Sequence, residues 1–120
     1  MRLAQWARRP NSSVKRIVLM GSHAGHKHPE ARWGAYSLGK MAMEDVATLL
    51  AVDLGTIGAT INVVCPSSID LADTKSPGIA SMPTGRTTSA NDVAAVVSFL
   101  LSDEASQING AAIAVDGGLP

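Results

Sequence analysis

Short runs of apolar residues alternate along the chain with longer stretches in which apolar and polar residues mix. Short apolar runs that end at small or polar residues are typical of buried parallel strands. This pattern predicts strands at Arg16 to Met20, Thr60 to Cys65 and Ala111 to Val115, with helices from about Ala35 to Asp53 and after Ser89. The order β-α-β-α-β, with right-handed crossovers, predicts an α/β fold with a three-stranded parallel sheet.

Local signals indicate where the two helices begin and end. Gly55 and Gly58 end the first helix, because glycine tolerates the backbone turn that follows a helix. Ser89 caps the second helix, with Asp92 three positions later in a capping box. The segment before it, up to about Thr88, is rich in Pro, Ser, Thr and Gly and predicts a loop. The apolar stripe of the second helix consists of Val93, Val96, Val97, Leu100 and Leu101.

The composition argues against several kinds of partner. Ten basic and ten acidic residues leave the 120-residue chain with no net charge, which gives no electrostatic footprint for nucleic acid or for an anionic membrane. No stretch approaches the apolar length needed to span a bilayer. We therefore expect a soluble protein with neither a nucleic-acid nor a membrane partner.

The single cysteine and the basic amino-terminal segment also bear on location. Cys65 lies in an apolar strand, where we expect it to pack as a small hydrophobic residue, and no disulfide can form within the chain. This usage suits a reducing cytoplasm. Met1 to Arg16 lacks acidic residues and superficially resembles a transit peptide. A helix end at Leu3 to Ala7, followed by a turn at Pro10 to Ser13, is the better interpretation.

Tyr36, Lys40 and Ser22 are the main candidates for chemistry. Tyr36 and Lys40 lie one turn apart on one face of the predicted helix, where an ammonium group can stabilise a phenolate. Ser22 follows a predicted strand, and open α/β sheets bind ligands beyond the carboxyl ends of their strands. A hydroxyl and a phenol can therefore converge there on one substrate atom. Taken singly, each residue also fits a plain role as a turn or surface residue.

These three residues resemble the serine, tyrosine and lysine of the short-chain dehydrogenase/reductase family in order and spacing. Residues 59–66 look like the family's next strand, which ends in a proline. Residues 89–94 and 99–106 are similar to its last long helix and the exit from that helix. Residues 108–118 resemble its final strand with the Asp-Gly-Gly ending. The resemblance covers nearly everything from Lys15 to Leu119.

The resemblance implies a Rossmann-like three-layer α/β/α fold, NAD or NADP as the cofactor, and a small-molecule alcohol or carbonyl substrate. It implies that Tyr36 exchanges a proton with the substrate oxygen and that Ser22 hydrogen-bonds the same oxygen. Lys40 would modulate Tyr36 and bind the nicotinamide ribose. Tyr36, Lys40 and Ile69 would contact the cofactor, Ile69 through its backbone. The family's Tyr-Lys helix commonly joins a four-helix subunit interface, so we expect a homo-oligomer.

Several family features have no counterpart in this sequence. The strand, glycine-rich turn and helix that hold the cofactor pyrophosphate are missing, as are the Asn-Asn-Ala-Gly segment and the helix asparagine of the catalytic tetrad. We therefore expect residues 1–120 to form a single partial domain, the carboxy-terminal segment of such a fold, with the serine strand at an open sheet edge. Activity would need the missing amino-terminal half. The alternative is a catalytically silent interaction or oligomerisation module.

Two departures from the family pattern follow Pro66. The family usually has glycine after this proline and commonly has threonine a little further on, whereas this chain has Ser67 and Leu71 at those positions, with Thr74 nearby. The stretch from Asp73 to Met82 is short for the family's substrate lid. A short lid is compatible with an open pocket, a bulky substrate or a damaged gene.

His23, His26 and His28 suggest a competing function, because clustered imidazoles can bind zinc or another transition metal. The sequence pattern places neither a cysteine nor a convincing carboxylate beside them. We therefore expect a polar loop next to the active site, without a metal. Trp33 is expected to be a packing residue and not a substrate platform, and Met41 and Met43 are expected to pack against a helix face or a subunit interface.

Overall fold

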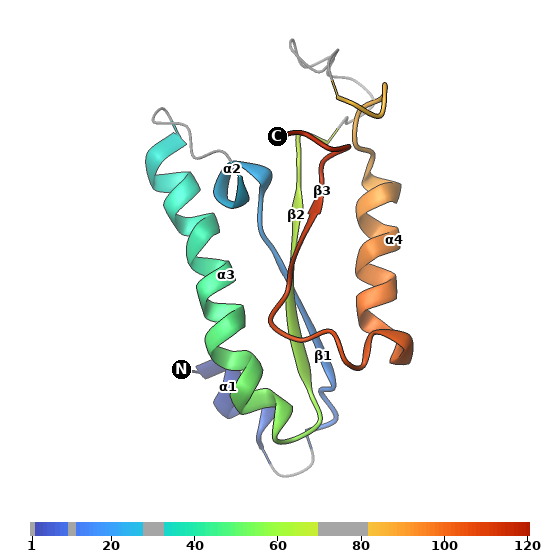
Figure 1. Ribbon diagram of the computed structural model, residues 1–120. Coiled ribbons are helices and arrows are strands. Elements are labelled where there is room, and N and C mark those ends of the chain that lie inside the picture. The colour runs from blue at the N-terminus through green and yellow to red at the C-terminus, as the bar shows by residue number, and fades with distance from the viewer. Residues whose placement is uncertain (1, 10–11, 28–32, 70–81) are drawn as a thin grey trace.

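The computed structural model describes residues 2–9, 12–27, 33–69 and 82–120. A short amino-terminal helix precedes the strands, and the two longer helices lie between them in sequence (Figure 1). The elements in chain order are α1 (Arg2–Ala7), β1 (Arg16–Met20), α2 (His23–His26), α3 (Gly34–Gly55), β2 (Thr60–Pro66), α4 (Ala90–Leu101), the 3-10 turn η3 (Asp103–Ala105) and β3 (Ala112–Val115).

The three strands form the predicted parallel sheet. Its order is β1-β2-β3, with Ile17 opposite Ile61 and Val64 opposite Ile113. Helix α3 covers one face and α4 the other, which gives three layers (Figure 1). Among the described residues β1 pairs only with β2, so the serine strand lies at a sheet edge as expected.

Strand β2 is buried along its whole length because both of its faces are covered. Side chains of a strand alternate between the two faces. Ile61 and Val63 therefore pack with Leu54 of α3, and Val64 packs with Leu100 of α4. This central position explains why the strand reads as an unbroken apolar run in the sequence.

Two asparagines fasten the segment that enters β3 to the rest of the sheet. The buried Asn62 donates to the carbonyl of Ile108 (2.8 Å) and accepts from the amide of Ala111 (3.0 Å). Asn109 accepts from the amide of Ile61 (2.9 Å) and donates to the carbonyl of α3 at Ala51 (2.8 Å). These side chains thus tie backbone groups of α3, of β2 and of the segment before β3 to one another.

The predicted bounds of the regular elements are confirmed to within a few residues. Ser89 accepts a hydrogen bond from the amide of Asp92, whose carboxylate accepts from the amide of Ser89, so the capping box is present. Leu101 departs from the predicted stripe, since it is 50% exposed. The helix end expected at Leu3 to Ala7 is confirmed as α1, while part of the turn after it lies outside the described residues.

The expected loop after β1 is wrong in part, because residues His23–His26 form helix α2. The side chain of Ser22 caps this helix. The helix is only four residues long, and its polar and small residues show no helical pattern in the sequence. No helix in the described part of the chain is long and apolar enough to cross a membrane.

Candidate active site

Tyr36 and Lys40 lie together near the start of α3. The Nζ atom of Lys40 is 5.7 Å from the centre of the Tyr36 ring. The same ammonium group donates a 2.8 Å hydrogen bond to the carbonyl oxygen of Met20, the last residue of β1. Lys40 is thereby held between the tyrosine and the carboxyl end of the strand, while Tyr36 remains 48% exposed.

Ser22 stands in the turn directly after β1. The preceding Gly21 donates its amide to Val64 of β2 (2.8 Å), and a Cβ atom at Gly21 would lie 2.7 Å from Cys65 Sγ. A side chain at position 21 would therefore force the turn away from the sheet. The Ser22 hydroxyl oxygen accepts from the amide of Ala24 (3.3 Å). Within the described part of the chain, Ser22 and Tyr36 form no hydrogen bond with each other.

A glycine brings the Ser22 turn against the helix that carries Tyr36 and Lys40. A Cβ atom at Gly25 would lie 2.7 Å from Lys40 Cβ and 2.9 Å from the amide nitrogen of Met41. Only a residue without a side chain allows α2 to approach α3 this closely. The three candidate residues are consequently placed at one end of the molecule by two neighbouring elements.

Trp33, which is expected to be a packing residue, lies beside Tyr36 near the start of α3. It is 49% exposed, and its ring lies 6.0 Å from the Tyr36 ring at a tilt of 59°. Met41 is 39% exposed, whereas Met43 packs against the core beneath α3. Trp33 and Tyr36 together present an aromatic surface beside Lys40 (5.7 Å from the Tyr36 ring centre).

Ile69 lies beyond the carboxyl end of β2, on the segment that follows Pro66. It forms an isolated parallel bridge with Thr88, and the Ser67 and Thr88 hydroxyls are 2.7 Å apart. The amide of Ser67 also donates to Val115 (3.1 Å), which holds the segment beside β3. Leu71, Thr74 and nearly all of the short lid lie outside the described residues, as does His28.

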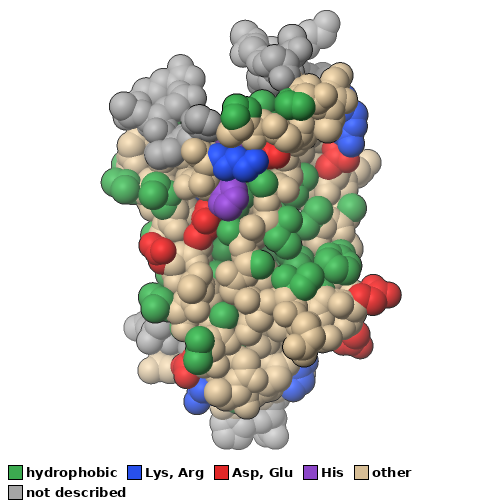
Figure 2. All heavy atoms as spheres, in the orientation of Figure 1, with side chains coloured by type: hydrophobic (Ala, Val, Ile, Leu, Met, Phe, Trp, Pro, Cys, Tyr) green, Lys and Arg blue, Asp and Glu red, His purple; other side chains and the backbone are tan. Residues whose placement is uncertain are grey.

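An ion-pair cluster that the sequence did not reveal joins α2 to the end of β3. Asp116 is buried and pairs with Lys27 (2.8 Å) and His23 (3.2 Å), and it accepts from the amide of Gly118 (3.0 Å). Burial acts to raise the pKa of Asp116, but the hydrogen bonds from Lys27, Gly118 and His23 outweigh it and lower that pKa. Figure 2 shows basic, acidic and imidazole side chains gathered over α2 and the nearby chain end.

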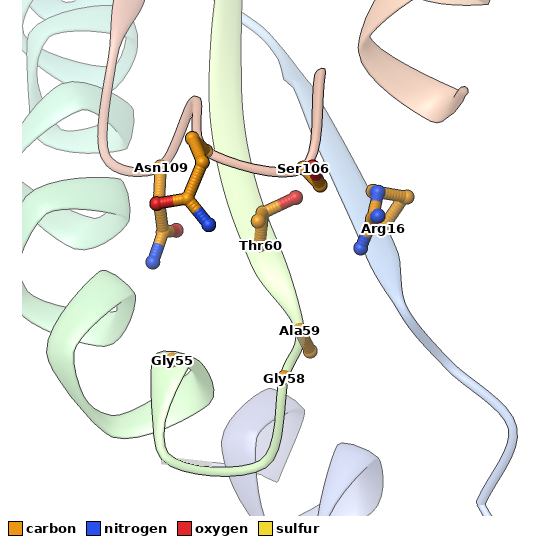
Figure 3. Close-up of a pocket in the computed structure, with 8 residues that line it drawn as sticks. Arg16, Gly55, Gly58, Ala59, Thr60, Ser106 and Asn109 are labelled. Atoms are coloured by element: carbon orange, nitrogen blue, oxygen red, sulfur yellow. The ribbon is translucent and has the colours of Figure 1, made fainter. Parts of the chain in front are cut away.

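A cavity of about 370 Å³ lies where β1 and β2 begin, at the opposite end of these strands from Ser22. Figure 3 shows the residues that line it. The buried hydroxyl of Thr60 has no hydrogen-bond partner among the described residues and points toward the side where Ser106 and Arg16 lie. Arg16 is held there by the carbonyl of Ser102 and the carboxylate of Asp103. This cavity is separate from the candidate active site. Its lining residues are Arg16, Gly55, Gly58, Ala59, Thr60, Ser106, Gln107 and Asn109.

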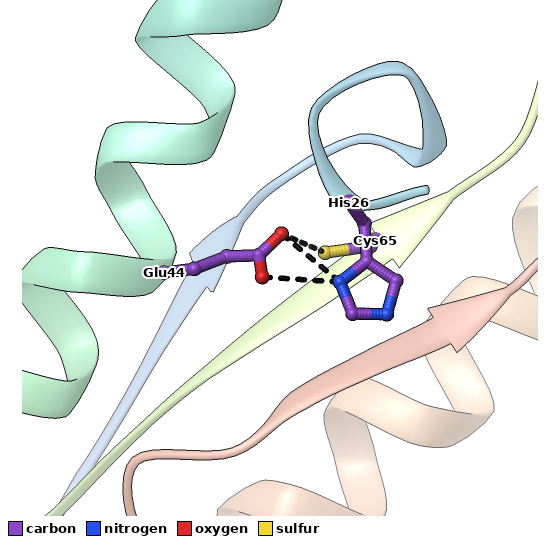
Figure 4. Close-up of side chains that lie close together, drawn as sticks. All are labelled: His26, Glu44 and Cys65. Atoms are coloured by element: carbon purple, nitrogen blue, oxygen red, sulfur yellow. Dashed lines mark hydrogen bonds and ion pairs between the residues drawn. The ribbon is translucent and has the colours of Figure 1, made fainter. Parts of the chain in front are cut away.

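The expectation that His26 has no cysteine or carboxylate beside it is wrong. His26 Nδ1 lies 3.0 and 3.1 Å from the carboxylate oxygens of Glu44, and the Cys65 thiol donates to Glu44 Oε1 at 3.7 Å (Figure 4). Burial and the charge of Glu44 raise the pKa of Cys65 to about 11. These residues are distant in sequence, so no local pattern signals their meeting.

Comparison with known proteins shows that the chain is similar to parts of reductases and dehydrogenases. The family model described as enoyl-(acyl carrier protein) reductase matches residues 1–120. Cyclohexanol dehydrogenase of Rhodococcus sp. (strain TK6) is 36% identical over 114 residues, covering 87% of this chain and 42% of that protein.

Solved structures agree in fold and sequence. BdcA in complex with NADPH has a TM-score of 0.78 and 35% identity, over 87% of this chain and 45% of that one. A short-chain type dehydrogenase/reductase from Mycobacterium ulcerans has a TM-score of 0.78 and 32% identity, over 88% of this chain and 41% of that one. The chain thus spans less than half the length of these relatives.

Proposed function

Because this chain belongs to the short-chain dehydrogenase/reductase family, we propose that it carries the proton-transfer part of an NAD(P)-dependent oxidoreductase that interconverts alcohols and carbonyls. The observation that carries the proposal is the position of Lys40, between the Tyr36 ring and the carbonyl of Met20. An ammonium held beside a phenol can stabilise the negative charge that develops on the phenol oxygen while its proton is transferred.

Tyr36 is the acid/base group of the proposed reaction. In the oxidising direction its phenolate takes the proton of the substrate hydroxyl, and in the reducing direction its phenol returns a proton to the substrate oxygen. The half-exposed ring leaves the hydroxyl open to a bound substrate. NAD or NADP would supply the hydride acceptor or donor.

Lys40 and Ser22 have donors that no described residue occupies and that fit the proposed roles. The Lys40 ammonium has three N–H groups and uses one for Met20, which leaves two for the ribose hydroxyls of a nicotinamide cofactor. The Ser22 oxygen accepts the Ala24 amide, so its own proton is free to donate to the substrate oxygen. Ile69 would face the carboxamide with its backbone, in the segment held beside Thr88.

We also propose that activity requires a second half of the fold. The relatives possess this half, and residues 1–120 do not match it. The open edge of β1 is the place where such a half would pair. The buried free thiol of Cys65 fits a reducing cytoplasm.

A chimera tests the proposal. The part of cyclohexanol dehydrogenase that has no match in this chain would be joined to residues 1–120, and reduction of NAD or NADP would be followed with cyclohexanol. Tyr36→Phe is expected to lower the rate by a factor of about 10²–10⁴. Lys40→Met should also lower it, whereas Lys15→Met, at an exposed position, should not. Full turnover by the Tyr36→Phe chimera would contradict the assignment.

A silent interaction module is the second candidate, favoured by an apolar face on α3. Leu38, Leu49 and Val52 are 66%, 74% and 78% exposed and lie on one side of the helix. In either case we propose that this face is a subunit interface. Leu49→Glu should then reduce the mass measured by sedimentation. Loss of assembly without any turnover in the chimera would favour the module over the enzyme.

A further inference from the structure

His26, Glu44 and Cys65 form a compact group of three different donors beneath α2. The imidazole comes from α2, the carboxylate from α3 and the thiol from β2 (Figure 4). Their nearest ligand atoms all lie within 4.8 Å of one another. We propose that these residues bind a divalent transition-metal ion of the zinc type, independently of the proposed oxidoreductase activity.

The separations between the donor atoms suit a zinc ion. Zinc binds nitrogen and oxygen at about 2.0–2.2 Å and thiolate sulfur at about 2.3 Å, so tetrahedral ligands lie about 3.3–3.7 Å apart. The observed distances are 3.0 Å from His26 Nδ1 to Glu44 Oε2 and 3.7 Å from Cys65 Sγ to Glu44 Oε1. The third pair, His26 and Cys65, lies within 4.8 Å, so an ion can enter with side-chain shifts of about 1 Å.

The fold sets these donors in place before any ion arrives. The close approach of Gly25 to Lys40 and Met41 fixes α2 on α3, and the close approach of Gly21 to Cys65 fixes the turn on β2. Both contacts lie within a few residues of a donor. A preformed donor set reduces the ordering cost of binding, which is the usual obstacle to a site assembled from distant segments.

The donor types select the class of metal. A nitrogen, a carboxylate oxygen and a sulfur suit zinc or cobalt, whereas calcium and magnesium prefer oxygen ligands alone. Binding breaks the S–H bond of Cys65 and releases that proton to solvent, and a neutral His26 carries its remaining proton on Nε2. The side chains of His26 and Glu44 are 24% and 26% exposed, so an ion has a path from solvent and room for a water as fourth ligand.

The site adjoins the candidate active site through Ser22. Gly21, the residue before Ser22, packs so closely on the thiol that a Cβ atom there would lie 2.7 Å from Cys65 Sγ. An ion on Cys65, Glu44 and His26 would join three elements: β2, the helix α2 that Ser22 caps, and the helix α3 that bears Lys40. The bound metal is expected to hold the Ser22 turn in a single position.

Cobalt(II) is the probe for the first experiment, because a cobalt–thiolate bond gives a charge-transfer band that oxygen and nitrogen ligands do not give. The full chain would be treated with a chelator, shown to be folded by circular dichroism and titrated with Co²⁺. One equivalent is expected to produce the charge-transfer band together with the visible bands of tetrahedral cobalt. Zinc should then displace the cobalt and remove both signals.

Three variants locate the ion. Cys65→Ser should abolish the charge-transfer band, and Glu44→Gln should weaken cobalt affinity at least tenfold. His23→Gln is the matched control, since its imidazole pairs with Asp116 instead, and it should bind as the wild type does. Zinc should raise the unfolding temperature of the wild type and of His23→Gln but not that of Cys65→Ser. An unchanged cobalt spectrum in folded Cys65→Ser, or no cobalt–thiolate band in the folded wild type, would overturn the proposal.

Discussion

The side-chain ammonium of Lys40 donates a hydrogen bond to the carbonyl oxygen of Met20, at a distance of 2.8 Å. Met20 is the last residue of β1, which is an edge strand, so its carbonyl lies at the carboxyl end of that edge strand. One contact thus fixes the position of the lysine relative to Tyr36 and ties helix α3 to the end of the serine strand. The same residue has a proposed catalytic role and a structural one.

Lys40→Met is expected to destabilise the chain by about 1 kcal/mol, because the carbonyl of Met20 loses its donor while the apolar stem is kept. Urea unfolding followed by circular dichroism would measure the change. Lys15→Met is the control, since Lys15 is exposed, and its effect should stay within about 0.5 kcal/mol. Equal stability of the two variants would show that the hydrogen bond contributes nothing.

Gly25→Ala is expected to destabilise the protein by about 1–3 kcal/mol, since the new Cβ atom would overlap Lys40 Cβ and the Met41 amide. Gly39→Ala provides the contrast, because a Cβ atom there meets nothing within 4 Å. Gly39 lies inside α3, where alanine should stabilise by about 0.5–1 kcal/mol. Thermal unfolding of both variants would check the opposite signs, and a neutral Gly25→Ala would refute the close packing of α2 on α3.

Asn62→Ala is expected to cost at least about 2 kcal/mol, because it leaves the amide of Ala111 and the carbonyl of Ile108 buried without their partners. Asn91→Ala, at an exposed position of α4, should change stability by less than about 0.5 kcal/mol. Denaturant unfolding gives both values. A small effect of Asn62→Ala would mean that water replaces the lost hydrogen bonds.

The Asp92 carboxylate should stabilise the folded protein by an amount that decreases at acidic pH. Hydrogen bonds from Arg86 and Ser89 lower the pKa of Asp92 in the folded protein, while the unfolded value is about 3.9. Its contribution is therefore fully present above about pH 4 and is lost as the pH falls below that value. The stability difference between wild type and Asp92→Asn should shrink between about pH 4 and pH 3. A difference that stays constant over this range would contradict the assignment.

Cys65 should give the opposite dependence at high pH. Burial, followed by the charge of Glu44, raises its folded pKa to about 11, whereas an unfolded thiol titrates near about 8.5. The folded state keeps the proton that the unfolded state loses, so this stability is present below about pH 8.5 and declines as the pH rises toward the folded value. In chelator-treated protein, the advantage of wild type over Cys65→Ala should fall through this window. An advantage that grows with pH would show that the thiol ionises in the folded state.

Several features followed from neighbouring residues alone. The apolar run at Arg16–Met20 gave the bounds of β1, and Ser89 with Asp92 gave the start of α4. Such features depend on backbone propensities and on hydrogen bonds that reach three or four residues, and these forces act wherever the segment lies. The order of these segments was enough to predict the parallel sheet with β1 at its edge.

The surroundings of the candidate site were decided by tertiary packing. Lys40 and Met20 form a hydrogen bond although they are twenty residues apart in the sequence, with α2 and the segment after it between them. His26, Glu44 and Cys65 meet because glycines at positions 21 and 25 let three elements approach closely. A sequence shows which donors are present, but the distance between them depends on how helices and strands pack. The order of Ser22, Tyr36 and Lys40, together with the motifs that follow them in the sequence, therefore identified the family, while the structure alone placed a carboxylate and a thiol beside His26.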